Sequence, residues 1–361
     1  MGTATLRNLW KLNNPFTSDS YELQQAYRQE LVQKFSKMNS DSWVTVARTV
    51  ADSLMPLLVR ADNTVSCNVK NISRHVTLAA VLTSLFDINE VETERLAYIG
   101  DEIHRLTVGK KQYDAGASTA ADLPLDMQQA AERLIENLRD LFADAKNTSQ
   151  LARTILCSVS GTTDDFNPLN LVIPAFEAPW RAIYYTLLAI LQSDCQARIQ
   201  DITALLVSEP QSSPHPAVLA VMYESLRMYP PIRRVRRDHR VDIEAIQRDT
   251  KYWGGDADTF DPRRFLDNCG RIKTELIGAG SAWMPFAVGS MKCPSAGGYS
   301  ARFMVVVISE VLRQLFLSGD KHGQLPNWRL DGPEWDHAAK SGQALRSGRD
   351  EYASVRLIVY P

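Results

Sequence analysis

The chain has few cysteines, and none of them is spaced as in a common metal or redox motif. Five occur among 361 residues, at Cys67, Cys157, Cys195, Cys269 and Cys293. No two form a C-x-x-C pair, the spacing typical of zinc and thiol-exchange sites. An odd number of widely separated cysteines does not make a disulfide framework, so the sequence favours a reducing compartment.

The chain also lacks long apolar runs and an excess of charge of either sign. No apolar stretch has the length of a membrane-spanning helix, and the N-terminal residues contain no signal peptide. Lys and Arg number 40 against 42 Asp and Glu, for a formal net charge of -2. This balance gives no reason to expect nucleic acid or an anionic membrane as partner. We therefore expect a soluble, cytoplasmic protein that acts on a small molecule.

Several catalytic motifs are absent as well. The sequence contains no H-E-x-x-H, no G-x-S-x-G and no phosphate-binding loop. Its six histidines are scattered, with no pair at the spacing of metal ligands. Gly278 and Gly280 lack the strand, turn and helix setting of a dinucleotide site. Histidine-ligated metal, serine-hydrolase and nucleotide-binding chemistries are therefore not indicated.

The chain does contain ample core-forming residues in helical patterns. Hydrophobic residues make up 45% and charged residues 23% of the sequence, as in a globular protein. The segment 232–288 is irregular, and residues 353–361 are typical of a strand. We expect a mostly α fold with small β sheets, in a single domain over residues 1–361. Apolar periodicity predicts helices over 21–36, 42–59, 72–85, 91–108, 125–144, 169–191, 217–228 and 299–317.

The predicted helix over 169–191 is apolar on nearly every face, which is typical of a buried helix. Its charged exceptions are Glu177 and Arg181, one turn apart on the same face, and the simplest interpretation is a buried ion pair. Ala178 and Pro179 follow the acid. Because Pro179 has no backbone N–H, we expect a kink at this point.

Three short motifs follow one another in the second half of the chain. The first is an E-x-x-R pair, Glu224 and Arg227, on a predicted helix that ends at a double proline. The second is an F-x-P-x-R-F turn over 260–265, and the third is an F-x-x-G loop over 286–289 that leads to Cys293 and an apolar helix. Taken singly, they are consistent with an exposed ion pair, an ordinary turn and a small buried cysteine.

In this order the motifs resemble the pattern of the cytochrome P450 superfamily. The stretch QRDTKYWGGDA, 247–257, is similar to an R-D-x-x-x-W-G-x-D-A stretch of its fungal members. The resemblance implies the mostly helical P450 fold, a heme b cofactor, and Cys293 as the thiolate ligand of the iron. Such a thiolate pushes electron density onto the iron and favours O–O cleavage. Phe286 and Gly289 would shape the heme-binding loop, and the following helix N-terminus would help keep the sulfur negative.

The resemblance also implies a charged triad. Glu224, Arg227 and Arg264 would hold the cysteine loop in place beneath the heme. Removing one member would leave a buried charge unpaired, at a cost of about 3–5 kcal/mol.

Cations for the two heme propionates are implied as well. The resemblance places Arg234 near one propionate, with Arg236 on the same face if this segment is a strand. Arg28, on the first helix, corresponds loosely to another propionate position. The alternative is that residues 233–240 form a solvated basic run.

The chain departs from the family pattern in four places. Residues 21–36 already resemble the family's C helix, so we expect this sequence not to include the family's membrane anchor and first strands, although a full-length relative could be anchored to the endoplasmic reticulum. A strand pair expected between Val241 and Ile246 is also missing, and we expect a reduced sheet. Around Cys293, Met291 stands where a basic residue is expected, and Ser295 stands where a glycine is expected.

The fourth departure is Ala178, which replaces a threonine whose hydroxyl helps deliver protons during oxygen activation in the family. In one interpretation Glu177 relays protons instead, and the protein is a monooxygenase of secondary metabolism. It would act on a hydrophobic small molecule and receive electrons from an NADPH-dependent reductase. In a second, the heme rearranges, dehydrates or cyclises a reactive substrate. A third is a catalytically silent heme-binding scaffold. Substrate identity and oligomeric state are not indicated by the sequence.

Overall fold

The computed structural model divides into two compact units. One comprises residues 1–45 and 78–177, and the other residues 46–77 and 178–361. The prediction of a single domain over residues 1–361 stays a prediction. The structure describes residues 9–12, 14, 17, 20–116, 124–144, 167–192, 205–206, 214–236, 240–278, 280–289, 292–296, 298–316, 326–336, 344–348 and 350–360.

The boundaries between the units fall within three helices, α3 (Ser40–Leu54), α4 (Val69–Phe86) and α8 (Leu169–Leu191). Helix α8 is buried along nearly its whole length, as its apolar sequence predicts, and it continues through Pro179.

Helices dominate the first unit. Besides parts of the three shared helices it contains α2 (Tyr21–Ser36), α5 (Thr93–Gly116) and α6 (Leu125–Asp144). Along α6 the buried leucines recur at helical spacing, at Leu134, Leu138 and Leu141, so one stripe of the helix faces the core.

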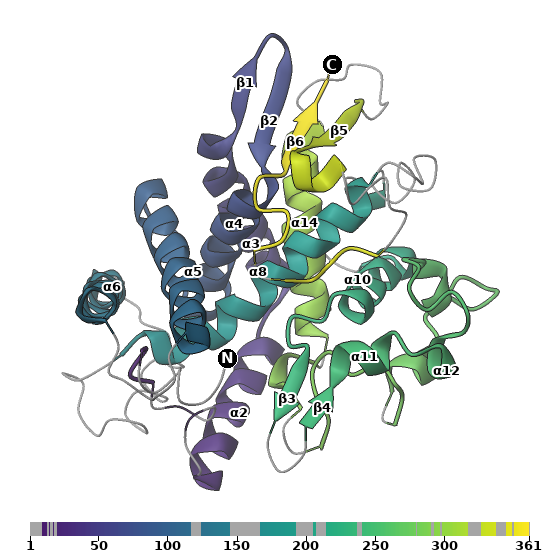
Figure 1. Ribbon diagram of the computed structural model, residues 1–361, viewed down its shortest axis with the longest axis horizontal. Coiled ribbons are helices and arrows are strands. Elements are labelled where there is room, and N and C mark those ends of the chain that lie inside the picture. Colours follow the sequence, from purple (N-terminus) through teal and green to yellow (C-terminus); the bar gives the residue numbers. More distant parts are fainter. Residues whose placement is uncertain are drawn as a thin grey trace. The chain divides into compact units, whose positions relative to one another are not determined.

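The second unit contains a four-stranded antiparallel sheet. Its strands are β1 (Val59–Ala61), β2 (Thr64–Asn68), β5 (Trp328–Asp331) and β6 (Arg356–Val359), in the order β1-β2-β6-β5 (Figure 1). Strands β1 and β2 are joined by a two-residue turn whose residues, Asp62 and Asn63, both have positive φ, of 47° and 61°. This is the hairpin turn that Asp and Asn tolerate well. The β1–β2 hairpin was not predicted, whereas strand β6 lies within the predicted segment 353–361.

Two long helices and a set of short elements complete the second unit. Helix α10 (Pro216–Met228) packs against α14 (Tyr299–Phe316). Asp242 and Asp249 cap the short helices α11 (Ile243–Gln247) and α12 (Thr250–Trp253), because their carboxylates accept backbone N–H groups of the first turn. The predicted irregular segment thus contains short regular elements. They are β3 (Arg234–Arg236), β4 (Arg240–Asp242), α11 (Ile243–Gln247), α12 (Thr250–Trp253), η3 (Pro262–Phe265) and α13 (Thr274–Ile277).

The predicted fold class, mostly α with small antiparallel sheets, is confirmed. The bounds expected for 21–36, 125–144 and 169–191 agree with α2, α6 and α8. Helix α3 ends at Leu54 instead of continuing to residue 59, because Pro56 lies in a separate 3-10 turn that leads into β1. Among the helices that the structure describes, none combines the length and apolarity needed to span a bilayer.

Candidate functional site

Cys293 lies at the end of a tight loop in the second unit. Its backbone N–H donates to the carbonyl of Phe286, 2.8 Å away, and this bond closes the loop. Gly289, with φ of 65°, takes the left-handed conformation that glycine adopts most easily, and Ala287 takes it too, with φ of 58°. The thiol is exposed. A 3-10 turn, η5 (Pro294–Ala296), and helix α14 follow directly.

The backbone on either side of this thiol is open at two glycines. A Cβ atom added at Gly289 or at Gly298 would meet no other atom within 4 Å. Val288, beside Gly289, is 60% exposed although it is apolar. An apolar side chain in the open next to an accessible sulfur is consistent with a surface that a hydrophobic cofactor covers.

Cys293 offers one accessible thiol. A heme iron needs only one protein ligand, because the porphyrin supplies four nitrogens, and a cysteine thiolate is one of the side chains that can provide it. The donor at Cys293 is therefore of a type that fits a heme. Within the described residues, no group of three or more His, Cys, Asp or Glu side chains is placed to hold a metal ion.

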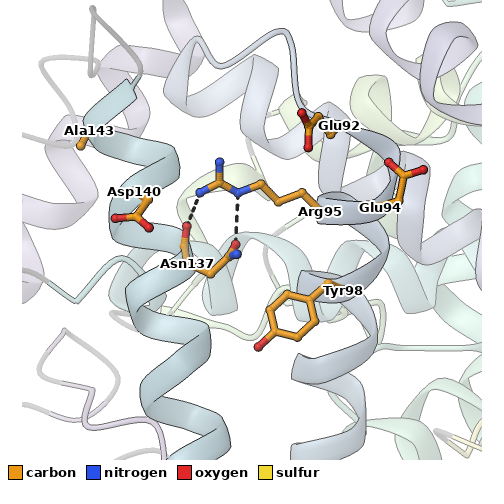
Figure 2. Close-up of a pocket in the computed structure, with 7 residues that line it drawn as sticks. All are labelled: Glu92, Glu94, Arg95, Tyr98, Asn137, Asp140 and Ala143. Atoms are coloured by element: carbon orange, nitrogen blue, oxygen red, sulfur yellow. Dashed lines mark hydrogen bonds between the residues drawn. The ribbon is translucent and has the colours of Figure 1, made fainter.

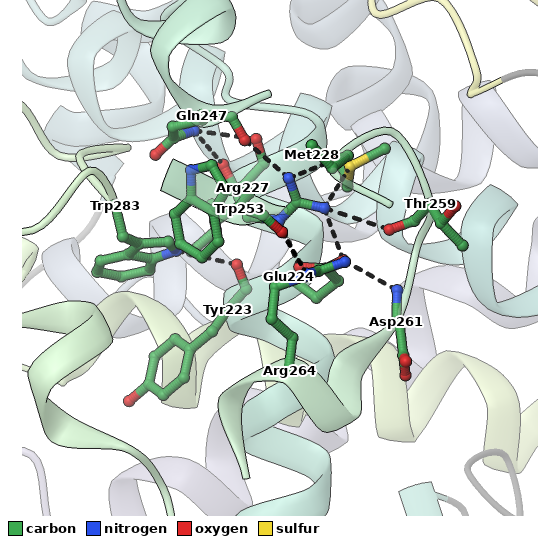
Figure 3. A network of polar contacts seen from close by, with 12 residues as sticks. Tyr223, Glu224, Arg227, Met228, Gln247, Trp253, Thr259, Asp261, Arg264 and Trp283 are labelled. Atoms are coloured by element: carbon green, nitrogen blue, oxygen red, sulfur yellow. Dashed lines mark hydrogen bonds and ion pairs between the residues drawn. The ribbon is translucent and has the colours of Figure 1, made fainter. Parts of the chain in front are cut away.

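Glu224 and Arg227 form a fully buried ion pair on α10. The Arg227 guanidinium donates to both carboxylate oxygens of Glu224, at 2.7 and 2.8 Å, and both side chains are 0% exposed (Figure 3). This two-bond geometry is the strongest arrangement available to the pair. The remaining donors of Arg227 are also used, because they bond the carbonyls of Gln247, Ala257 and Thr259.

Arg264 reaches the same carboxylate less directly. Its Nε lies 3.7 Å from Glu224 Oε1, beyond hydrogen-bond distance, so this contact is mainly electrostatic. The guanidinium donates instead to the carbonyl of Trp253, at 2.8 Å, and to the carboxylate of Asp256. Its bond to Asp256 lowers the pKa of that carboxyl group. The three residues that the sequence proposed as a triad are thus brought together, with Arg227 as the closer partner of Glu224.

Gln247 connects this network to the start of the cysteine loop. Its side chain is 0% exposed and donates to the carbonyls of Leu226 and Arg227, both at 3.0 Å. Its Oε1 accepts the backbone N–H of Met284 at 2.7 Å. Met284 precedes Phe286 by two residues, so one amide links the C-terminal end of α10 to the cysteine loop. Sequence reasoning assigned Gln247 no role, although it opens the 247–257 stretch that resembles the family.

The three arginines expected at the propionates differ in their own surroundings, and their role at a propionate stays a prediction. Arg234 lies on the β3–β4 hairpin, is 57% exposed, and pairs with Asp242 on the facing strand at 2.8 Å. Arg236 is in β3, as the alternation required, but its side chain lies outside the described residues. Arg28 is half-buried on α2 in the first unit. Met291 also lies outside the described residues.

Glu177 and Ala178 lie in the middle of α8. The Glu177 side chain is buried, with 8% of it exposed, and the boundary between the two units falls between these two residues. Phe176 and Trp180 flank them and are both 0% exposed. Burying a carboxylate in so apolar a helix costs free energy, so we expect the group either to have a polar partner or to take part in function.

A hollow in the first unit was not predicted. It has a volume of about 680 Å³ and lies between α5 and α6 (Figure 2). Arg95 crosses it, donating to the backbone carbonyl of Asn137 at 2.5 Å and to its side-chain oxygen at 3.2 Å. None of the predicted site residues lines it. The lining residues are mostly polar: Glu92, Glu94, Arg95, Tyr98, Asn137, Asp140 and Ala143.

Comparison with known proteins supports the resemblance to cytochromes P450. No family model matches the chain. Cytochrome P450 71A14 of Arabidopsis thaliana is 28% identical over 201 residues, which cover 48% of this chain and 36% of that protein. Cytochrome P450 734A2 of Oryza sativa subsp. japonica is 33% identical over 114 residues, covering 27% and 19%. Germacrene A hydroxylase of Helianthus annuus is 30% identical over 108 residues, covering 25% and 21%.

The chain thus spans little more than a third of the length of the first of these relatives and about a fifth of the other two. Several of the matched proteins are named cytochrome P450, and their similarity to parts of this chain supports the superfamily.

Proposed function

We propose that this chain is a heme-thiolate oxidoreductase of the cytochrome P450 superfamily, with Cys293 as the axial ligand of heme b. The observation that carries the proposal is the arrangement of the loop. An exposed thiol sits in open, partly apolar surroundings at the end of a hydrogen-bonded loop. A buried charged network reaches the start of that loop through Gln247 and Met284.

Each residue of the network has a defined task in this proposal. Glu224 and Arg227, with Arg264, fix the polypeptide that leads to the loop. Phe286 closes the loop through its carbonyl, and Gly289 provides the left-handed turn. When bound, a heme with a thiolate ligand supplies oxygen-activating redox chemistry. The protein's part is to hold the sulfur in one position and orientation.

The proposed contact of Arg234 with a heme propionate has to be compatible with its bond to Asp242. Arg234 already bonds Asp242, so it would contact a propionate either by sharing its guanidinium or by leaving that carboxylate. Arg236 and Arg28 complete the proposed set. In each case a guanidinium would bond a carboxylate through paired N–H donors.

The activity we propose is monooxygenation of a hydrophobic small molecule in natural-product metabolism, with electrons from an NADPH-dependent reductase. Phe176 and Trp180 flank Glu177 on α8, and they are the kind of large apolar side chains that such substrates contact. Glu177 would move protons on that helix. A hydroxylase of Helianthus annuus is among the similar proteins, and the 247–257 stretch resembles fungal members of the superfamily.

A second candidate function is favoured by the residues after Glu177. Ala178 has no hydroxyl and Pro179 has no N–H, so neither of these two residues supplies a side-chain hydroxyl for proton delivery. This composition suits a reaction in which no oxygen is activated, such as rearrangement, dehydration or cyclisation of a reactive substrate. A silent heme-binding scaffold is the third possibility.

A difference spectrum of the reduced protein with carbon monoxide tests the ligand. The parent should give the long-wavelength Soret band of a thiolate ligand, and Cys293→Ser should lose it. Cys269→Ser is the matched control, because Cys269 is also exposed but lies on a turn away from the loop. Absence of the band in the parent would refute the proposal. Oxygen uptake with NADPH and a reductase, coupled to product, would support monooxygenation, whereas anaerobic turnover would support the second candidate.

A further inference from the structure

Two serine hydroxyls form a series of hydrogen bonds that ends at the sulfur of Cys293. Ser300, in the first turn of α14, donates to Ser295 Oγ at 2.6 Å. Ser295, in the η5 turn, has its Oγ 3.1 Å from Cys293 Sγ. Both serines are half-buried, so water competes with these bonds only in part.

The direction of these two hydrogen bonds follows from the chemistry of the sulfur. A thiolate carries no proton and can only accept, and Ser295 already accepts from Ser300. When the sulfur is a ligand, the Ser295 hydroxyl therefore points its hydrogen at Cys293 Sγ. A bond of this kind to a charged acceptor is stronger than one between neutral groups.

The backbone N–H groups of Cys293 and of the residue before it bond within the loop. The N–H of Cys293 donates to Phe286 and the N–H of Lys292 donates to Gly289, at 2.8 and 3.1 Å. These two groups hold the loop together and are not directed at the sulfur. A side-chain donor is thus the group that the structure places against Cys293 Sγ. A glycine at position 295 would supply no such donor.

We propose that Ser295, oriented by Ser300, is a positioning residue that tunes the electron donation of the Cys293 thiolate. The inference rests on the proposed function, since it presumes that Cys293 binds heme iron. A hydrogen bond withdraws negative charge from the sulfur, which weakens its push on the iron and raises the reduction potential. Helix α8 lacks a hydroxyl at Ala178, where the family pattern has a threonine. The turn after Cys293 has a hydroxyl at Ser295, where the family pattern has a glycine. Both changes act against oxygen activation and favour the second candidate function.

The test measures the iron reduction potential by spectroelectrochemistry, together with the Soret position of the reduced carbon monoxide complex. Ser295→Gly and Ser295→Ala should make reduction about tenfold less favourable, a fall of about 59 mV for a one-electron couple. Their Soret band should move to longer wavelength. Ser300→Ala should move both quantities in the same direction by a smaller amount, because Ser295 keeps its hydroxyl but loses its orientation.

Two further variants separate tuning from simple structural damage. Ser295→Thr keeps a hydroxyl and should retain the parental potential. Ser281→Ala removes a hydroxyl that bonds the Trp283 carbonyl, at 3.4 Å, and should leave the potential and the Soret band unchanged. If Ser295→Gly and Ser295→Ala fail to bind heme, the Ser300→Ala potential decides the matter.

The outcomes separate this inference from the proposed function. A parent without the thiolate-type band would refute both. Suppose that the parent has the band, and that the potentials of Ser295→Ala and Ser300→Ala equal the parent's. This result would refute the tuning role of Ser295 and Ser300 alone. A potential lowered in Ser295→Ala and restored in Ser295→Thr would establish it.

Discussion

Replacing Gln247 with leucine should lower the free energy of unfolding by about 3 kcal/mol. The Gln247 amide is 0% exposed and makes three hydrogen bonds, to Leu226 O, Arg227 O and Met284 N. A hydrogen bond of this kind contributes about 1 kcal/mol net, and a buried N–H left without a partner costs about 1–3 kcal/mol. Leucine has a similar size, so the loss is mainly of hydrogen bonding and not of packing.

Urea denaturation followed by far-ultraviolet circular dichroism measures this loss. Gln247→Glu should be at least as damaging, because a carboxylate keeps the bond from Met284 but cannot donate to the two carbonyls and carries a buried charge. Gln314→Leu is the matched control. Gln314 is half-buried and bonds Glu310 one turn away on the same helix, so its loss should cost about 0.5 kcal/mol.

Hydrogen exchange provides a second, local readout. In the parent, the Met284 amide should exchange slowly, because its N–H is bonded to a buried oxygen. In Gln247→Leu it should exchange much faster, whereas in Gln314→Leu it should not change. A loss of stability below about 1 kcal/mol with a still-protected Met284 amide would refute the reasoning.

Three other predictions follow from charge and burial. Arg227→Lys should lower stability by about 3 kcal/mol in the same urea assay, because an ammonium cannot make the paired bonds of a buried guanidinium; an unchanged midpoint would contradict this. Burial lowers the pKa of His75 from 6.5 to about 4, so the folded protein keeps it neutral while the unfolded chain takes up a proton. Stability should therefore fall by up to ~3 kcal/mol as the pH drops from 6.5 to 4 and then level off. A His75→Gln variant with the same pH profile would rule this cause out. Iodoacetamide should modify the exposed Cys269 and Cys293 but not Cys67, which is buried and whose thiol pKa burial raises to about 12. Added hemin should protect Cys293 alone, and equal labelling with and without hemin would count against the ligand assignment.

Much of the helical framework could be predicted because its signals are local. Helix α8 is long and apolar, and α6 has a regular stripe of leucines, so length and periodicity alone define them. The grouping of Glu224, Arg227 and Arg264 was inferred from the family resemblance, and the structure brings them together. The spacing of their motifs, without that resemblance, indicates only a surface pair and a turn.

The features that sequence reasoning missed depend on distant partners. The β1–β2 hairpin follows α3 without a break in apolar character, and its pairing with β6 cannot be read from either segment alone. The role of Gln247 arises from two carbonyls on α10 and an N–H from residue 284. The ion pair of Arg234 with Asp242 depends on the pairing of β3 with β4 and was not expected from the sequence. The contact of Arg234 with a propionate stays a prediction. These pairings and hydrogen bonds depend on tertiary contacts, which cannot be recognised in a short window of sequence.

The position of β6 in its sheet has a consequence for folding during synthesis. Strand β6 lies between β2 and β5, and Arg356 bonds Ser66 across 290 residues of sequence. At roughly 5–20 residues per second, a ribosome takes on the order of 15–60 s to bridge that separation. Until residues 356–359 emerge, β2 has an unpaired edge with free N–H and C=O groups, the type of edge on which strands of other chains aggregate. A chaperone that shields the nascent chain over this interval would act first on residues 64–68.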